Sequence, residues 1–284
     1  MNGEDRIFAA CAPGLEPVLA AELARLGLAA RAVPGGAEAE GRDAVALACL
    51  GSRVADAVKL RGRGAPDRDP VGAPLFKRGW RARVGAAPLR ESLAAGLLLH
   101  LGFDGSVPFL DPMCGSGTLA VEAALVAARR APGLPRTFAF ERWPGHAARR
   151  TAALRERLAR EARTPPCPIH ASDRNGGAVR LARKNAEAAG VANWVRIDRA
   201  DAAALRPPTG PGLLLVNPPY GIRLEEEVEG SWRALGALVE RARGWRVAVL
   251  TGDARLARLL PGRPETSLEV RNGGIRCRLL VCSP

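Results

Sequence analysis

The chain has 284 residues, 47% of them hydrophobic, and a formal net charge of +13 at pH 7. This composition supports a sizeable core and excludes a disordered chain. No apolar run reaches the roughly 20 residues that span a bilayer. Because the sequence shows no signal-peptide pattern, we expect a cytoplasmic protein. We further expect a monomer or a weak dimer. Six cysteines without a CxxC pair and three scattered histidines argue against a disulfide framework and a metal site.

The positive charge is concentrated in one part of the chain. Residues 1–64 carry eight acidic and eight basic side chains, whereas residues 111–224 carry nine acidic and eighteen basic ones. A basic region of this kind fits a phosphate-bearing partner such as RNA. The basic residues are nearly all arginine, which is also the bias of a GC-rich genome. The charge therefore supports a nucleic-acid partner without proving one.

Residues 1–64 predict a small α+β segment. Residues 7–28 indicate a short strand, a turn and a helix whose leucines recur at helical spacing. We interpret the apolar run 44–50 as a strand. Residues 61–74 are rich in Gly, Pro, Arg and Asp and indicate a linker. We therefore expect a second, catalytic domain over residues 65–284.

In this second domain, strands and helices alternate along the chain. The expected strands are 107–110, 168–171, 194–197, 213–216 and 246–250. The expected helices are 89–101, 117–130, 175–189 and 231–243. Strands separated by helices predict an α/β fold with a doubly wound, mainly parallel, seven-stranded Rossmann-like sheet. A hairpin over 269–281, turning at Asn272-Gly273-Gly274, would add an antiparallel edge.

A glycine-rich turn, Asp111–Thr118 (DPMCGSGT), follows the first of these strands. It lacks the Gly-Lys-Ser/Thr of a P-loop and a full GxGxxG fingerprint. Its acidic residue can hold an ammonium group, and the following helix N-terminus favours a carboxylate. The turn therefore suits the amino-acid part of S-adenosylmethionine, although an ordinary strand-to-helix turn is the alternative. The predicted cofactor residues here are Asp111, Cys114, Gly115, Ser116, Gly117 and Thr118.

Acidic residues also follow the next two strands. Asp173 occupies the place where α/β nucleoside sites put a carboxylate on ribose hydroxyls. It could equally cap the helix that starts at Asn175. Asp201 is our preferred acceptor for the adenine amino group, with Asp198 as the competing choice. The predicted residues in this part of the cofactor site are Asp173, Arg174, Asp201 and Ala202.

The turn Asn217-Pro218-Pro219-Tyr220 follows the apolar strand 213–216. Proline lacks the N–H donor that would extend the strand, so this pair fixes a rigid turn. The Asn217 amide oxygen and the Pro218 carbonyl can each accept an N–H from the exocyclic amine of a base. Tyr220 can stack on that base. We predict Asn217, Pro218, Pro219 and Tyr220 as catalytic residues, with Asn217 also contacting the cofactor. A plain proline-rich turn is the alternative.

Together, these motifs resemble those of the bacterial methyltransferases that make N2-methylguanine in large-subunit ribosomal RNA, and of relatives with a THUMP domain. The similar stretches are 8–26, 75–81 (LFKRGWR), 87–95 (APLRESLAA), 111–124, 138–143 (FAFERW), 217–224 (NPPYGIRL), 250–253 (LTGD) and 272–279 (NGGIRCRL). The resemblance implies a class I methyltransferase fold with a ferredoxin-like N-terminal segment. It implies S-adenosylmethionine at Asp111, 115–118, Asp173 and Asp201, and guanine at 217–220.

One feature departs from that family. A THUMP domain should lie before the LFKRGWR stretch, but only residues 51–74 occupy that interval, which is too short for an α/β RNA-binding domain. The basic residues of 129–163 and 174–206 are a candidate substitute for binding RNA. Three alternatives stay open: an adenine-N6 methyltransferase acting on RNA or DNA, a glutamine-N5 methyltransferase acting on release factors, and an inactive RNA-binding paralogue.

Overall fold

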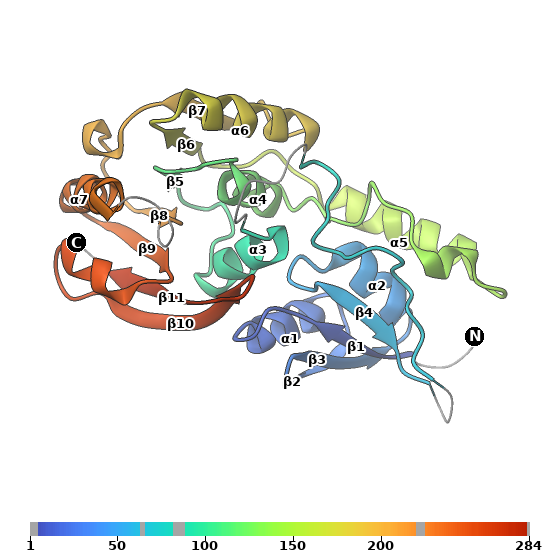
Figure 1. Cartoon of the computed structure of the whole chain (residues 1–284). Helices are drawn as coiled ribbons and strands as arrows, with labels where there is room; N and C mark the ends of the chain where they lie inside the picture. Colours follow the sequence, from blue (N-terminus) through green and yellow to red (C-terminus); the bar gives the residue numbers. More distant parts are fainter. Residues whose placement is uncertain (1–4, 63–65, 82–88, 220–224, 283–284) are drawn as a thin grey trace. The chain divides into compact units, whose positions relative to one another are not determined.

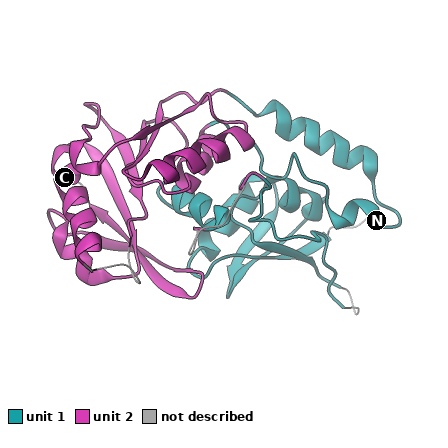
Figure 2. Cartoon of the chain, turned by 45° about the horizontal axis from the view of Figure 1, so that its top comes forward, with its two compact units in different colours: residues 1–79, 90–102, 128–163 teal, residues 80–89, 103–127, 164–284 magenta. Residues whose placement is uncertain are grey.

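The computed structural model describes residues 5–62, 66–81, 89–219 and 225–282 (Figure 1). The chain divides into two compact units, each built around its own sheet (Figure 2). Unit 1 comprises residues 1–79, 90–102 and 128–163, and unit 2 comprises residues 80–89, 103–127 and 164–284. The units are therefore interleaved along the chain, because residues 66–79, 90–102 and 128–163 cluster with the N-terminal sheet.

Unit 1 contains a four-stranded antiparallel sheet in the order β2-β3-β1-β4. Its strands are β1 (Asp5–Ala10), β2 (Ala29–Val33), β3 (Gly36–Gly41) and β4 (Ala57–Leu60). Helix α1 (Glu16–Arg25) joins β1 to β2, and α2 (Ala44–Gly51) joins β3 to β4. The central strand β1 pairs on both edges, with Ile7 opposite Ala39 on one side and Leu60 on the other. This β-α-β-β-α-β order is ferredoxin-like.

The expected strand at 44–50 is wrong, because these residues form helix α2. All eight residues of α2 are buried. A short segment that is apolar on every side shows no period that distinguishes a helix from a strand. Three alanines favour the helix, and Asp43 precedes it in the left-handed region, at φ 63°.

Three more elements belong to unit 1: α3 (Glu91–His100), the 3-10 helix η1 (Ala139–Arg142) and α5 (Ala148–Arg160). The FAFERW stretch folds around Glu141, whose Oε1 accepts hydrogen bonds from the Phe138 N–H (3.0 Å) and from Arg155 (2.7 Å). Arg155 also donates to the carbonyl oxygens of Leu134 (2.9 Å) and Arg136 (2.7 Å). The glutamate of this motif therefore holds a turn in place.

Unit 2 confirms the expected seven-stranded sheet, in the order β10-β11-β9-β8-β5-β6-β7. The strands are β5 (Phe109–Asp111), β6 (Ile169–Asp173), β7 (Val195–Arg199), β8 (Gly212–Val216), β9 (Trp245–Thr251), β10 (Glu265–Asn272) and β11 (Ile275–Cys282). β5 to β9 pair in parallel, and the expected hairpin β10–β11 adds an antiparallel edge. The chain runs outward from β5 through β6 to β7 and then returns to β8 on the other side. β5 and β8 therefore form the switch point, where such sheets bind ligands.

Helices of unit 2 position the strand ends. They are α4 (Thr118–Ala127), α6 (Gly176–Ala188) and α7 (Glu225–Arg241), with 3-10 turns η2 (Ala202–Ala204) and η3 (Ala254–Leu259). Helix α7 begins six residues before the expected 231, and its Trp232 is fully buried. Trp232 lies in a core cluster with Leu214 and Val216 of β8. This cluster fixes the strand that leads into the Asn-Pro-Pro turn.

Between Leu60 and Glu91, the described residues form no helix or strand, only an isolated bridge from Leu60 to Arg68. The described residues of the interval 61–74 therefore form no folded domain of their own. Among the described helices, none combines the length and apolar character needed to cross a bilayer. In the same residues, no three potential metal ligands gather.

Candidate functional site

Three predicted site residues lie at one edge of the seven-stranded sheet. Asp111 ends β5 and Asp173 ends β6, while Asn217 directly follows β8. These three strands are parallel neighbours, with β5 between β6 and β8. Parallel strands present their carboxyl ends at the same edge. The topology thus brings together side chains that lie far apart in the sequence.

Asp173 fastens the glycine-rich turn to β6. Its Oδ2 accepts a hydrogen bond from the Gly115 N–H (2.9 Å), and its Oδ1 accepts one from the Asn175 N–H (2.8 Å). The Cys114 N–H donates to the Ser172 carbonyl oxygen (2.8 Å). Asn175, rather than Asp173, caps α6, because its side chain accepts from the Gly177 N–H at 2.8 Å. The Asp173 carboxylate is therefore oriented towards the turn.

Two glycines give the turn its shape. Gly117 has φ +82°, and a Cβ there would lie 2.9 Å from the Cβ of Ala182 on α6. Gly115 has φ +52°, but no atom lies within 4 Å of a Cβ built there. Gly117 thus allows close packing against α6. Gly115 leaves open space beside the backbone, which a ligand can enter.

Asp111 is a buried carboxyl group with few hydrogen bonds from the described residues. Only 1% of its surface is exposed, and among the described residues its sole hydrogen bond comes from the Met113 N–H, at 3.3 Å. The pKa of Asp111 is raised to about 8, mainly by burial and to a smaller extent by the charge of Asp173, while the Met113 hydrogen bond opposes the shift. A cationic ligand would lower this pKa again. Asp111 is therefore suited to receive an ammonium group.

Cys114 is buried in the same turn. Burial raises the pKa of its thiol far above the ordinary value, and the charges of Asp111 and Asp173 add to the shift. The thiol consequently stays protonated at neutral pH, and no thiolate nucleophile forms. Its Sγ contacts the Gly115 carbonyl oxygen at 3.8 Å. Cys114 shapes the turn rather than reacting.

The predicted adenine and ribose residues differ in their surroundings. Asp201 is exposed after β7, and its Oδ1 accepts from the Ala203 N–H (2.8 Å), which starts η2. The rival Asp198 lies within β7 and pairs with Arg196 at 2.7 Å. Ala202 is buried in the core cluster of β8. The side chain of Arg174 is exposed beside Asp173. Of the two candidates for the adenine acceptor, only Asp201 lies beyond the carboxyl end of β7.

The Asn-Pro-Pro turn presents two oxygen acceptors. Asn217 Oδ1 is buried and receives no hydrogen bond from the described residues. The Pro218 carbonyl oxygen accepts no backbone N–H from them, whereas the Pro219 carbonyl oxygen accepts a hydrogen bond from Trp232 Nε1 at 3.1 Å. A buried acceptor without a donor costs stability, so its presence here points to an incoming N–H group. Tyr220, the fourth predicted residue, lies outside the described residues.

Three functional candidates escaped the sequence reasoning. Arg81 donates through Nη2 to Thr118 Oγ1 at 2.8 Å, and Asn185 Nδ2 donates to the Ser116 carbonyl oxygen at 2.9 Å. Trp232 holds Pro219, as described above. Arg81 lies in the LFKRGWR stretch, and Asn185 is a polar residue on the buried face of α6. Those two signals could have identified them, but nothing in the sequence pairs Trp232 with Pro219.

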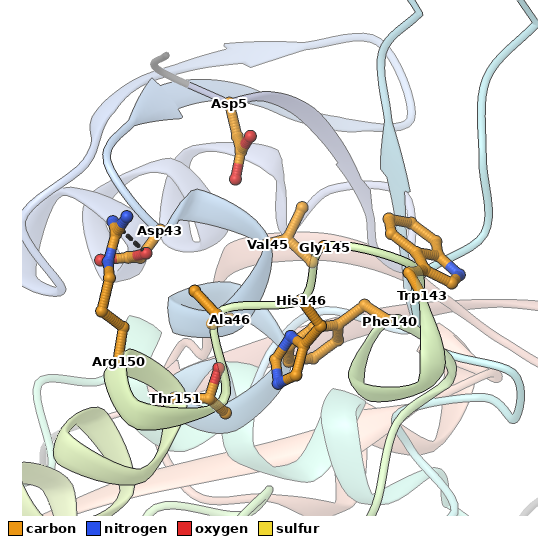
Figure 3. A pocket seen from close by; sticks show the side chains of 11 residues that line it. Asp5, Asp43, Val45, Ala46, Phe140, Trp143, Gly145, His146, Arg150 and Thr151 are labelled. Atoms are coloured by element: carbon orange, nitrogen blue, oxygen red, sulfur yellow. Dashed lines mark ion pairs between the residues drawn. The ribbon is translucent and has the colours of Figure 1, made fainter. Parts of the chain in front are cut away.

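A separate pocket lies in unit 1 (Figure 3). Its walls come from β1, the start of α2, η1 and the start of α5, and include Asp5, Trp143 and His146. Asp43 and Arg150 form an ion pair at one side. None of the predicted cofactor or base-binding residues contributes to its walls. This pocket is therefore distinct from the site in unit 2.

Comparison with known proteins identifies the family. Residues 78–280 match the model of the RMKL-like methyltransferase domain, and residues 6–59 match that of the RlmL ferredoxin-like domain. The chain belongs to the RMKL-like methyltransferase family. The two matches leave residues 60–77 between them. This family assignment agrees with the sheet order and with the ferredoxin-like arrangement of unit 1.

Individual members extend the comparison. A ribosomal RNA large subunit methyltransferase K/L from Pseudoalteromonas atlantica is 36% identical over 242 residues, which are 81% of this RMKL-like chain and 34% of that protein. The protein of the same name from Marinomonas is 39% identical over 224 residues, which are 74% of this chain and 31% of that protein. The chain spans about a third of the length of the curated relatives it matches.

Two solved structures have nearly the same fold. SMU.472, complexed with SAH, has a TM-score of 0.91 over 100% of this chain and 99% of its own, at 23% identity. A protein described as a predicted N6-adenine-specific DNA methylase from Listeria monocytogenes has a TM-score of 0.89, covering 99% and 97% of the two chains, at 25% identity. The relatives are named for ribosomal RNA, whereas the structure from Listeria is named for DNA, so proteins of this fold carry names that refer to two kinds of nucleic acid.

Proposed function

We propose that this RMKL-like chain uses S-adenosylmethionine to methylate the exocyclic amine of a nucleic-acid base, namely N2 of guanine in ribosomal RNA. The observation that carries the proposal is the buried Asn217 Oδ1, which has no hydrogen-bond donor among the described residues. It lies at the carboxyl end of β8, beside the β5 end that bears Asp111. Family membership supports the methyltransferase class.

The residues of the glycine-rich turn fit the proposed cofactor. Asp111 would face the ammonium group of its methionine part, since burial leaves this carboxyl in need of a cation. Open space beside Gly115 would admit the ligand, and the Asp173 carboxylate would face the ribose. Asp201 would accept from the adenine amino group. When bound, S-adenosylmethionine supplies an electrophilic methyl group on a sulfonium.

The Asn-Pro-Pro turn would prepare the amine for attack. An exocyclic amine is a poor nucleophile because its lone pair is conjugated to the base ring. Asn217 Oδ1 and the Pro218 carbonyl oxygen can each accept one N–H and thereby favour a pyramidal nitrogen with its lone pair free. Most of the rate would then come from alignment, which is worth several kcal/mol in well-oriented reactions. The hydrogen bond from Trp232 to Pro219 holds the turn.

The basic residues of α5 are candidate contacts for the proposed RNA substrate. On α5, Arg149 and Arg157 are exposed and make no ion pair with the described residues. In contrast, the arginines Arg150, Arg155 and Arg160 pair with Asp43, Glu141 and Glu156. Exposed, unpaired arginines are the ones that can neutralise phosphates. We propose that the unpaired arginines of α5 contact the RNA backbone, which predicts binding that weakens with salt.

Methyl transfer to three classes of acceptor tests the proposal. The full chain is incubated with methyl-labelled S-adenosylmethionine and with unmodified ribosomal RNA, DNA or a release factor, with the Asn217→Ala variant as control. We expect label in RNA only, recovered as N2-methylguanosine, and little label with the variant. Recovery of N6-methyladenosine would transfer the proposal to adenine. Label in the release factor alone, or no transfer at all, would overturn it.

A further inference from the structure

Arg81 reaches the glycine-rich turn from a distant part of the unit 2 sequence. Its Nη2 donates hydrogen bonds to the Leu89 carbonyl oxygen (2.6 Å) and to Thr118 Oγ1 (2.8 Å). Thr118 is buried and is the first residue of α4. Arg81 is half-buried next to the buried Trp80, whose ring centre is 5.8 Å from its guanidinium carbon. The guanidinium is therefore held at the end of the turn.

The turn consequently carries opposite charges at its two ends. Asp111 begins it and, when ionised, supplies a negative charge, whereas the Arg81 guanidinium is fastened to Thr118, where the turn ends. An amino-acid group has an ammonium and a carboxylate on one carbon atom, so its receptor needs opposite charges close together. Asp111 can serve only the ammonium, because it and Asp173 repel a carboxylate. The carboxylate is favoured by positive charge at the other end, where the N-terminus of α4 and the Arg81 guanidinium both lie.

We propose that Arg81 binds the carboxylate of the cofactor's methionine part and so positions the methyl group for transfer. The inference rests on the function proposed above. A guanidinium always carries its charge and presents paired N–H donors that match the two oxygens of a carboxylate. Arg81 is a positioning residue, because it touches the cofactor away from the reacting atoms.

A competing explanation is purely structural, because the hydrogen bonds from Arg81 to Leu89 and Thr118 also tie the segment near Leu89 to α4. Two ligands separate the explanations. S-adenosylhomocysteine carries the amino-acid group, whereas 5′-methylthioadenosine keeps the sulfur and the adenosine but lacks that group. A carboxylate contact affects only the first ligand. A structural role affects both ligands equally.

Isothermal titration of the full chain with each ligand tests the proposal. For Arg81→Gln we expect the affinity for S-adenosylhomocysteine to fall about tenfold or more, since a charged hydrogen-bond partner is removed. The affinity for 5′-methylthioadenosine should change less than about twofold. Arg81→Lys keeps the charge without the paired donors and should fall in between. The control is Arg183→Gln, because Arg183 donates to the Ile197 carbonyl oxygen on β7 instead.

The outcomes are separable. A selective loss of affinity for S-adenosylhomocysteine in Arg81→Gln, but not in Arg183→Gln, supports the inference. Equal losses for the two ligands, or unchanged affinity for both, overturn it while the proposed function stands. If Arg81→Gln does not fold, Arg81→Lys decides by the same comparison of ligands. A wild-type chain that binds neither ligand contradicts the proposed function itself.

Discussion

Trp232 Nε1 donates a hydrogen bond to the carbonyl oxygen of Pro219 at 3.1 Å. This bond joins the fully buried face of α7 to the turn that bears Asn217. It also occupies the Pro219 carbonyl oxygen. The acceptors left for a substrate amine are therefore Asn217 Oδ1 and the Pro218 carbonyl oxygen. The turn is thus held by the core rather than by its prolines alone.

The first prediction concerns this bond. Trp232→Phe should lower the turnover of methyl transfer about tenfold, because the turn loses its anchor, while the affinity for S-adenosylhomocysteine stays unchanged. The free energy of unfolding should fall by about 1–3 kcal/mol, since the Pro219 carbonyl oxygen loses its donor. Single-turnover kinetics, ligand titration and urea denaturation measure the three quantities.

Trp245→Phe is the matched control. Trp245 is also buried, and its Nε1 donates to the Pro208 carbonyl oxygen at 3.0 Å, away from the Asn-Pro-Pro turn. This variant should lose comparable stability but keep its turnover. If both variants lose turnover equally, the effect reflects general stability and not the anchoring of Pro219.

The second prediction concerns the carboxylate of Asp173. Asp173→Asn should lower the free energy of unfolding by about 1–3 kcal/mol without any ligand, because the amide keeps only one acceptor for the two N–H groups of Gly115 and Asn175. Asp198→Asn is the control on the adjacent strand, since its ion pair with Arg196 is largely exposed and worth about 0–1 kcal/mol. Equal losses in urea denaturation would argue against a role of Asp173 in holding the turn.

The third prediction concerns the pH dependence caused by Asp111. Its pKa is raised to about 8 in the folded chain from an ordinary value of 3.8. The unfolded carboxyl therefore ionises first, and its contribution to stability is present below about pH 4 and lost as the pH rises towards 8. The free energy of unfolding of the wild type should fall relative to Asp111→Asn across this range. Parallel pH profiles for the two proteins would contradict a buried, protonated Asp111.

Ligand binding should show the same linkage. At pH 7, S-adenosylhomocysteine should release protons on binding, because its ammonium group favours the ionised form of Asp111. Calorimetry in buffers of different ionisation enthalpy measures this release. Asp111→Asn should bind more weakly and release fewer protons. Equal release by both proteins would mean that the protons come from another group.

The fourth prediction concerns the RNA partner. RNA affinity should fall steeply with added salt. In the double variant Arg149→Gln/Arg157→Gln, the slope of the logarithm of the affinity against the logarithm of the salt concentration should become shallower. The expected change is about 0.7–0.9 for each phosphate that is no longer neutralised. Arg160→Gln, whose arginine already pairs with Glu156 on the same helix, should change the slope less. Filter binding over a range of salt concentrations measures the slopes. A slope that does not change in the double variant would exclude α5 from RNA binding.

Much of the fold could be predicted because polar residues mark the carboxyl ends of its strands. Asp111 and Asn217 each follow a short apolar run, and Asp173 follows the predicted strand 168–171, so an alternating α/β pattern places them at one edge. The prediction of a strand at 44–50 was wrong, because a wholly buried helix has no polar face that would show its helical period. Arg81 and Trp232 act through tertiary contacts. Arg81 and Thr118, for example, are 37 positions apart, and no local pattern reports such a pairing.

The most direct test of the central claim is mass spectrometry of ribosomal RNA nucleosides from a strain that lacks the gene. The deletion strain is complemented with a gene that encodes either the wild-type chain or the Asn217→Ala variant. We predict that the amount of N2-methylguanosine falls in the deletion strain, is restored by the wild type, and is not restored by the variant. Unchanged N2-methylguanosine in the deletion strain, or full restoration by Asn217→Ala, would contradict the account.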